Sequence, residues 1–149
     1  VTAAIMVLIG LAGYKTTYAE FVTEPDLSPK IAAAVLNKII RPDDAYFPRY
    51  GIDNHIRYYL TDASEAVYML MFEYKRNGML NTKIKNGLQK IYCVFNGEPD
   101  FEKIYRIYNI DQEILRQHYK PFTLYFQSGT VMIYMAERKM PKTRRRPTL

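Results

Sequence analysis

The sequence has one cysteine and two histidines, the residue types that most often provide a catalytic nucleophile and its base. Cys93 and His118 would be the pair for covalent chemistry, since an imidazole can accept the thiol proton. However, Cys93 lies between Ile91 and Phe95, where a small buried thiol is the usual occupant. Neither His55 nor His118 has metal-ligand spacing with another ligand type. We therefore expect no catalytic residue and no metal site.

Carboxylates and glycines give no stronger sign of catalysis. Glu65, Glu73, Glu102 and Glu113 could supply an acid–base pair, but spacing selects none of them, and exposed helix faces usually carry such residues. The seven glycines are dispersed, and no phosphate-cradling loop, dinucleotide fingerprint or nucleophile elbow is present. We expect a protein that is not an enzyme and that has neither a cofactor nor a small-molecule substrate.

Positive charge is concentrated near the C-terminus. The chain has 21 Lys and Arg against 15 Asp and Glu, and residues 138–149 hold six of the basic residues and no acidic one. The remainder is neutral, which argues against a broad electrostatic surface for DNA or RNA. Near an anionic membrane, each basic residue contributes about 1 kcal/mol. The candidates for binding an anionic surface are Arg138, Lys139, Lys142, Arg144, Arg145 and Arg146.

The opening segment, residues 1–13, is apolar and uncharged. It is shorter than the roughly 20 residues of a membrane-spanning helix. It suits the core of a signal peptide, a helix in a membrane interface, or a buried helix of the domain. We expect it to belong to the working protein. The candidates for membrane insertion are Ile5, Leu8, Ile9 and Leu11.

Hydrophobic spacing predicts the elements that must position these residues. It indicates helices over residues 2–20, 28–39, 52–74, 84–95, 99–108 and 111–120, separated by Pro, Gly and Asp. Residues 122–127 and 130–135 are rich in Tyr, Phe, Val and Ile, and Ser128-Gly129 could turn a hairpin. Helical spacing also fits this stretch, and we favour helix there. The prediction is all-α: one domain, residues 1–137, folded as an up-and-down bundle of about five helices with a short C-terminal hairpin as the alternative, followed by a basic tail, residues 138–149.

Two short stretches give the sequence a family resemblance. Ala66-Val67-Tyr68-Met69-Leu70 and Tyr134-Met135-Ala136-Glu137, the latter followed by Met140-Pro141, resemble the abalone sperm acrosomal family, which contains lysin and a fusogenic paralogue. Residues 14–21 are similar to the first helix of that family. The absence of Trp, the neutral body, and Pro25 and Pro29 depart from the lysin pattern and put envelope dissolution in doubt. The resemblance is therefore closer to the fusogenic paralogue.

The resemblance implies a compact helical bundle, secreted through the sperm acrosome, that promotes sperm–egg fusion without catalysis. An anionic membrane surface would be its partner. The alternative is a lysin-like stoichiometric binder of an egg-coat glycoprotein that opens the vitelline envelope. A second alternative is a basic-tailed nucleic-acid-binding protein, although the neutral body disfavours nucleic acid. Cys93 has no internal disulfide partner, and a homodimer is left open.

Overall fold

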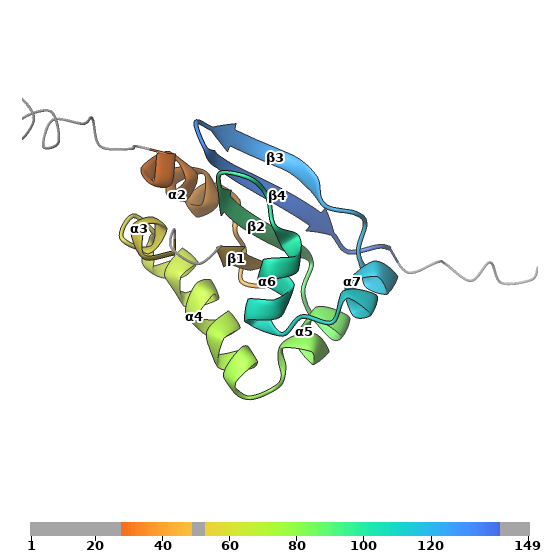
Figure 1. Cartoon of the computed structure of the whole chain (residues 1–149). Coiled ribbons are helices and arrows are strands. Elements are labelled where there is room, and N and C mark those ends of the chain that lie inside the picture. Colours follow the sequence, from red (N-terminus) through yellow and green to blue (C-terminus); the bar gives the residue numbers. More distant parts are fainter. Residues whose placement is uncertain (1–27, 49–52, 141–149) are drawn as a thin grey trace, which may run out of the picture.

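The computed structural model describes residues 28–48 and 53–140, which form a mixed sheet with helices on both faces (Figure 1). The prediction of an all-α bundle is wrong, because four strands form one sheet in the order β1-β2-β4-β3. β1 is parallel to β2, and β4 is antiparallel to both β2 and β3. In chain order, the elements are α2 (Ser28–Ile39), β1 (Ala45–Pro48), α3 (Asp53–Arg57), α4 (Asp62–Arg76), α5 (Leu80–Asn86), β2 (Lys90–Asn96), α6 (Phe101–Tyr108), α7 (Gln112–His118), β3 (Thr123–Ser128) and β4 (Val131–Glu137).

The central strand β2 falls where the spacing predicted a helix over residues 84–95. α5 ends at Asn86, Gly87 follows, and the chain is extended from Lys90. Residues 91–95 are all buried, because both faces of β2 are covered. Such a strand shows no apolar–polar alternation, and a continuous apolar run fits a helix equally well by periodicity alone. This prediction was wrong for that reason.

β3 and β4 form the hairpin that was the alternative to a helix after Pro121. Gly129 supplies the left-handed backbone conformation at the turn, with φ 55°. Ser128 pairs with Val131, and the β3 register shifts between Leu124 and Phe126. The preference for helix was wrong, because the β-branched and aromatic side chains pack on a pleated surface rather than on one helix stripe.

Several predicted helices are confirmed, with changed bounds. α2 covers residues 28–39 as expected, and α6 and α7 match the predictions at 99–108 and 111–120. The predicted helix over 52–74 is two helices, because Thr61 adopts an extended conformation and its hydroxyl accepts from the Ser64 N–H as the N-cap of α4. The predicted helix over residues 2–20 lies outside the described residues, and β1 was not predicted.

The sheet separates two apolar clusters. Ile91, Cys93 and Phe95 of β2 face the side that α5, α6 and α7 cover, and Tyr92 and Val94 face the side that α2 and α3 cover. α4 runs beside β1 and contributes to both clusters (Figure 1). Alternate residues of each strand therefore serve two separate cores, as the pleat requires.

A buried carboxylate connects the beginnings of β1 and β2. Asp44 Oδ2 accepts from the Arg41 N–H at 3.0 Å, and Asp44 Oδ1 accepts from the Lys90 N–H at 3.1 Å. Burial raises the pKa of Asp44 above its usual 3.8, although both backbone hydrogen bonds act in the opposite direction. Asp44 thus accepts hydrogen bonds from two backbone N–H groups near the point where β1 and β2 begin to pair.

Replacing each of two buried tyrosines with phenylalanine should change the free energy of unfolding in opposite directions. The Tyr46 hydroxyl is buried and has no hydrogen-bond partner among the described residues, whereas the Tyr108 hydroxyl donates to the Pro48 carbonyl at 3.1 Å. Tyr46→Phe should raise the free energy of unfolding by about 1 kcal/mol, because an unpaired buried hydroxyl is removed. Tyr108→Phe should lower it by about 1 kcal/mol. Urea unfolding of both variants checks this, and a loss of stability in Tyr46→Phe contradicts it.

Candidate anion-binding surface

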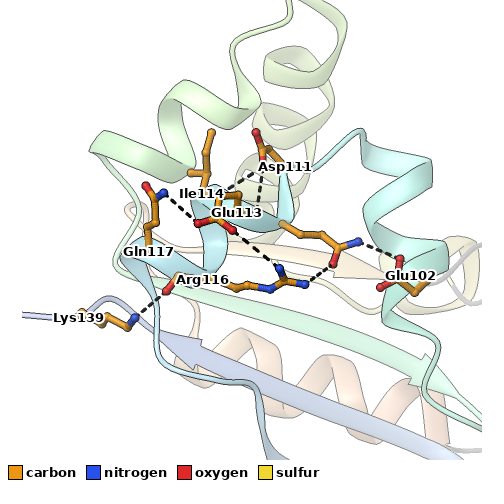
Figure 2. Close-up of polar contacts among 8 residues, drawn as sticks. Glu102, Asp111, Glu113, Ile114, Arg116, Gln117 and Lys139 are labelled. Carbon is orange, nitrogen blue, oxygen red and sulfur yellow. Dashed lines mark hydrogen bonds and ion pairs between the residues drawn. The ribbon is translucent and has the colours of Figure 1, made fainter.

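The C-terminal end of α7 lies against the end of β4. The Lys120 N–H donates to the Glu137 carbonyl at 2.9 Å, and the Lys139 N–H donates to the His118 carbonyl at 2.8 Å. The Lys139 ammonium donates to the Arg116 carbonyl at 2.6 Å, which pairs one of the open carbonyls at the end of this helix (Figure 2). Two basic segments that are far apart in the sequence therefore meet here.

Polar contacts also fix the beginning of α7. Asp111 Oδ1 caps the helix by accepting from the Glu113 N–H at 2.8 Å (Figure 2). The Asp111 N–H donates to Asn81 Oδ1 at 2.8 Å, and the Asn81 amide donates to the Asn109 carbonyl at 2.9 Å. Asn81 is on α5, so α5 holds the loop from which α7 starts.

Arg138 connects β4 to α5. Its guanidinium donates to the carbonyls of Ile84, Lys85 and Leu88 at 2.6, 3.0 and 2.7 Å. It also donates to the Tyr119 hydroxyl at 3.1 Å and stacks over that ring at 5.1 Å. These carbonyls belong to the last turn of α5 and the residues after it, where helix carbonyls lack internal partners. Arg138 thus acts as a C-terminal cap that comes from the residue directly after β4.

Six cations lie around this junction and define what we call the basic surface. Glu113 and Glu137 form ion pairs with these cations, and Asp44 and Glu102 lie nearby, where they accept from the Lys90 N–H and the Gln112 amide. Glu137 lies 3.3 Å from the Lys120 ammonium and 3.8 Å from that of Lys90, so one carboxylate serves two cations. Pairs this exposed contribute little to stability, and one carboxylate can offset only one of the two charges that it contacts. Five of these basic residues line two hollows at the junction, and Lys85 contacts Arg138 through its backbone carbonyl. The six are Lys85, Lys90, Arg116, Lys120, Arg138 and Lys139.

Other parts of the described chain offer weaker chemistry. Cys93 is fully buried, and burial raises the pKa of its thiol, which makes it a packing residue rather than a nucleophile. No cluster of three or more His, Cys, Asp and Glu that could hold a metal ion exists within residues 28–48 and 53–140. None of the helices in those ranges is long and apolar enough to cross a bilayer.

A hollow of about 850 Å³ lies along α4, and Met69 and Phe72 are among the residues that line it. It is mainly apolar, and its polar side chains are Glu73, Lys75 and Arg76. No histidine or cysteine lines the described part of it. The basic surface is the stronger candidate because its charges converge from α5, β2, α7 and the end of β4.

No family model, curated protein or solved structure matches this chain. The resemblance to the sperm acrosomal family therefore stays a prediction, and the helical bundle that it implied is wrong. The stretch 66–70 is helical within α4, but residues 134–137 belong to strand β4, where the bundle would require a helix.

The structure places only part of the site predicted from the sequence. Arg138 and Lys139 were assigned to a separate tail, yet both bond to the domain. The other tail candidates, Lys142, Arg144, Arg145 and Arg146, and the membrane-insertion candidates, Ile5, Leu8, Ile9 and Leu11, lie outside the described residues.

Four cations of the basic surface were missed: Lys85, Lys90, Arg116 and Lys120. A signal for them exists in the sequence, because residues 74–97 and 114–136 contain no Asp or Glu. Residues 1–137 contain equal numbers of basic and acidic residues, so their net charge of zero did not reveal these two acid-free stretches. The fold brings the stretches together through α5, β2, α7 and β4.

Proposed function

We propose that this protein binds anionic membrane surfaces without catalysis, through the basic surface and the cations of residues 141–149. The observation that carries the proposal is the convergence of six basic residues at the point from which the basic tail continues. Within the described chain, only Glu113 and Glu137 form ion pairs with them. Arg138 and Lys139 are bonded to the domain, so Lys142 and Arg144 follow directly in sequence from the same surface. One patch and one basic segment would then act on the same membrane, as peripheral binding requires.

An exposed apolar side chain favours a membrane over a nucleic acid. Met140 is 90% exposed and lines a hollow of about 270 Å³. Four cations, Lys90, Lys120, Arg138 and Lys139, and one carboxylate, Glu137, also line this hollow. Cations beside an apolar side chain suit the boundary between headgroups and acyl chains. The apolar opening segment would add a second contact of the same kind, with Ile5, Leu8, Ile9 and Leu11 inserting. Sperm–egg fusion and egg-coat binding remain predictions of the resemblance.

Vesicle binding tests the proposal through matched charge losses. The double variant Lys85→Gln/Lys90→Gln should bind phosphatidylserine vesicles roughly thirtyfold more weakly than the wild type, because two cations at about 1 kcal/mol each are lost. The variant Lys30→Gln/Lys38→Gln removes the same charge from exposed positions of α2 and should change binding less than about threefold. Cosedimentation at low and moderate salt measures both.

Three outcomes overturn the proposal. Wild-type protein that binds neither phosphatidylserine nor phosphatidylcholine vesicles rejects membrane binding. Equal losses in the two double variants reject the basic surface as the contact. Preference for duplex DNA over phosphatidylserine vesicles at matched salt favours the nucleic-acid alternative, whose affinity should fall steeply with salt.

A further inference from the structure

A pocket of about 260 Å³ lies beside the basic surface, between α6, α7 and the chain that leads into β3. Cationic side chains on its lining are Arg116, Lys120 and Lys139, and no carboxylate is among the described residues that line it. Leu115 and Phe122 provide an apolar part of the wall. The pocket therefore combines three positive charges with a small apolar wall.

Each of the three cations has a protein partner: a carbonyl for Lys139, and exposed ion pairs for Arg116 and Lys120. The Lys139 ammonium is fixed on the neutral Arg116 carbonyl at 2.6 Å. Arg116 Nη2 donates to Gln112 Oε1 at 3.3 Å, and its ion pair with Glu113 is long, at 3.8 Å, and exposed (Figure 2). Lys120 shares Glu137 with Lys90. Ordered donors lose less conformational entropy on binding an anion than free side chains lose.

Two neutral donors complete the lining. Burial raises the pKa of Tyr105 to about 12, so its hydroxyl is protonated at neutral pH. The Gln112 amide donates to Glu102 Oε2 at 2.9 Å, which orients the amide from α6 (Figure 2). Both side chains line the pocket and can support an anion that the cations attract.

We propose that this pocket binds a phosphomonoester, with Arg116, Lys120 and Lys139 as its cationic ligands. A phosphomonoester carries a charge of about −1.5 to −2 at neutral pH and three strong acceptor oxygens. A carboxylate or a phosphodiester offers a single charge and two oxygens. Three cations thus match the monoester best, and the apolar wall formed by Leu115 and Phe122 accepts the first carbon atoms beyond the ester oxygen.

This inference deepens the proposed function, because a phosphomonoester lipid headgroup would give the basic surface a lipid preference. It rests on that function only for the lipid source, since a soluble phosphomonoester presents the same chemistry. The two sources can be separated by experiment.

The experiment for a soluble ligand titrates the full chain with phenyl phosphate and follows binding by NMR. Wild-type protein should show saturable binding with shifts at the amides of Arg116 and Lys120, and benzoate should bind at least about tenfold more weakly. Lys120→Gln/Lys139→Gln should weaken phenyl phosphate binding at least about tenfold. Lys30→Gln/Lys38→Gln, which removes the same charge from exposed positions of α2, should change it less than about twofold.

A rescue variant separates ligand binding from an effect on folding. Lys120→Arg/Lys139→Arg keeps both charges and should recover most of the affinity that the Gln variant loses. Absence of saturable phenyl phosphate binding to the wild type overturns the inference. Equal losses in the two Gln variants, or shifts confined to residues outside α7 and residues 119–122, also overturn it.

The lipid arm compares vesicles of equal surface charge that contain phosphatidic acid, a monoester, or phosphatidylglycerol, a diester. A preference for phosphatidic acid that Lys120→Gln/Lys139→Gln removes and Lys30→Gln/Lys38→Gln retains supports the lipid source. Phenyl phosphate binding without that preference supports the pocket and assigns it a soluble ligand. If no vesicle binds, the proposed function fails, and the phenyl phosphate titration alone decides the inference.

Discussion

Replacing Arg138 with alanine is expected to lower the free energy of unfolding by about 2–4 kcal/mol, because a partly buried guanidinium with several hydrogen-bond partners is lost. The side chain bonds to three carbonyls around the end of α5 and to the Tyr119 hydroxyl. That hydroxyl lies 2.8 Å from the Ile84 carbonyl and 2.7 Å from the Leu88 carbonyl, but it has one proton to donate. Without Arg138, at least two carbonyls lose their partner.

The control variants distinguish the bonding pattern from the charge. Arg138→Lys keeps the charge but has no planar fork, and we expect it to recover less than half of the lost stability. Lys139→Gln removes a neighbouring exposed cation and should cost about 1 kcal/mol or less. Urea unfolding with one circular dichroism probe measures all three. If Arg138→Lys is as stable as the wild type, the network acts only through its charge.

Replacing Phe95 with alanine is expected to cost about 3–5 kcal/mol, the range for removing a fully buried aromatic side chain and leaving a cavity. Phe95 is completely buried in β2. Its ring packs edge-on against Phe101 of α6 at 4.9 Å and against Tyr134 of β4 at 5.8 Å. It thus joins the middle of the sheet to the helix that covers it.

A substitution at an exposed position of the same sheet serves as the control for Phe95→Ala. Leu124 of β3 is 50% exposed, and Leu124→Ala should cost about 1 kcal/mol or less. Thermal unfolding of both variants, at one pH and salt concentration, gives the comparison. Similar losses for Phe95→Ala and Leu124→Ala would show that the cluster around Phe95 is loosely packed.

Sequence reasoning recovered the helices whose ends are marked chemically. Pro42 follows α2, and Asp100 and Asp111 cap α6 and α7, so local signals were sufficient there. It failed at β2, because a strand buried on both faces has the continuous apolar character of a buried helix. The short strand β1 was missed because residues 45–48 carry no period long enough to detect.

The candidate site was predicted only at its C-terminal end. Clustered cations such as Arg144, Arg145 and Arg146 are visible in any charge count. Lys90 and Lys120 become neighbours only because β4 lies between β2 and the end of α7 and presents Glu137 to both. Pairing between segments so far apart in the chain is a property of the fold, which local patterns do not encode.

The position of β4 within the sheet has a consequence for how the chain folds. Residues 131–137 form the last strand of the described part of the chain, yet β4 lies between β2 and β3. During synthesis, β2 therefore emerges long before the neighbour that hydrogen-bonds to its second edge, and β3 emerges before its partner strand. Until then, the apolar edge of β2 is open to pairing with other chains. Completion of the sheet also waits for these long-range contacts, so we expect its closure to be the slow step of folding and the point at which nascent or truncated chains aggregate.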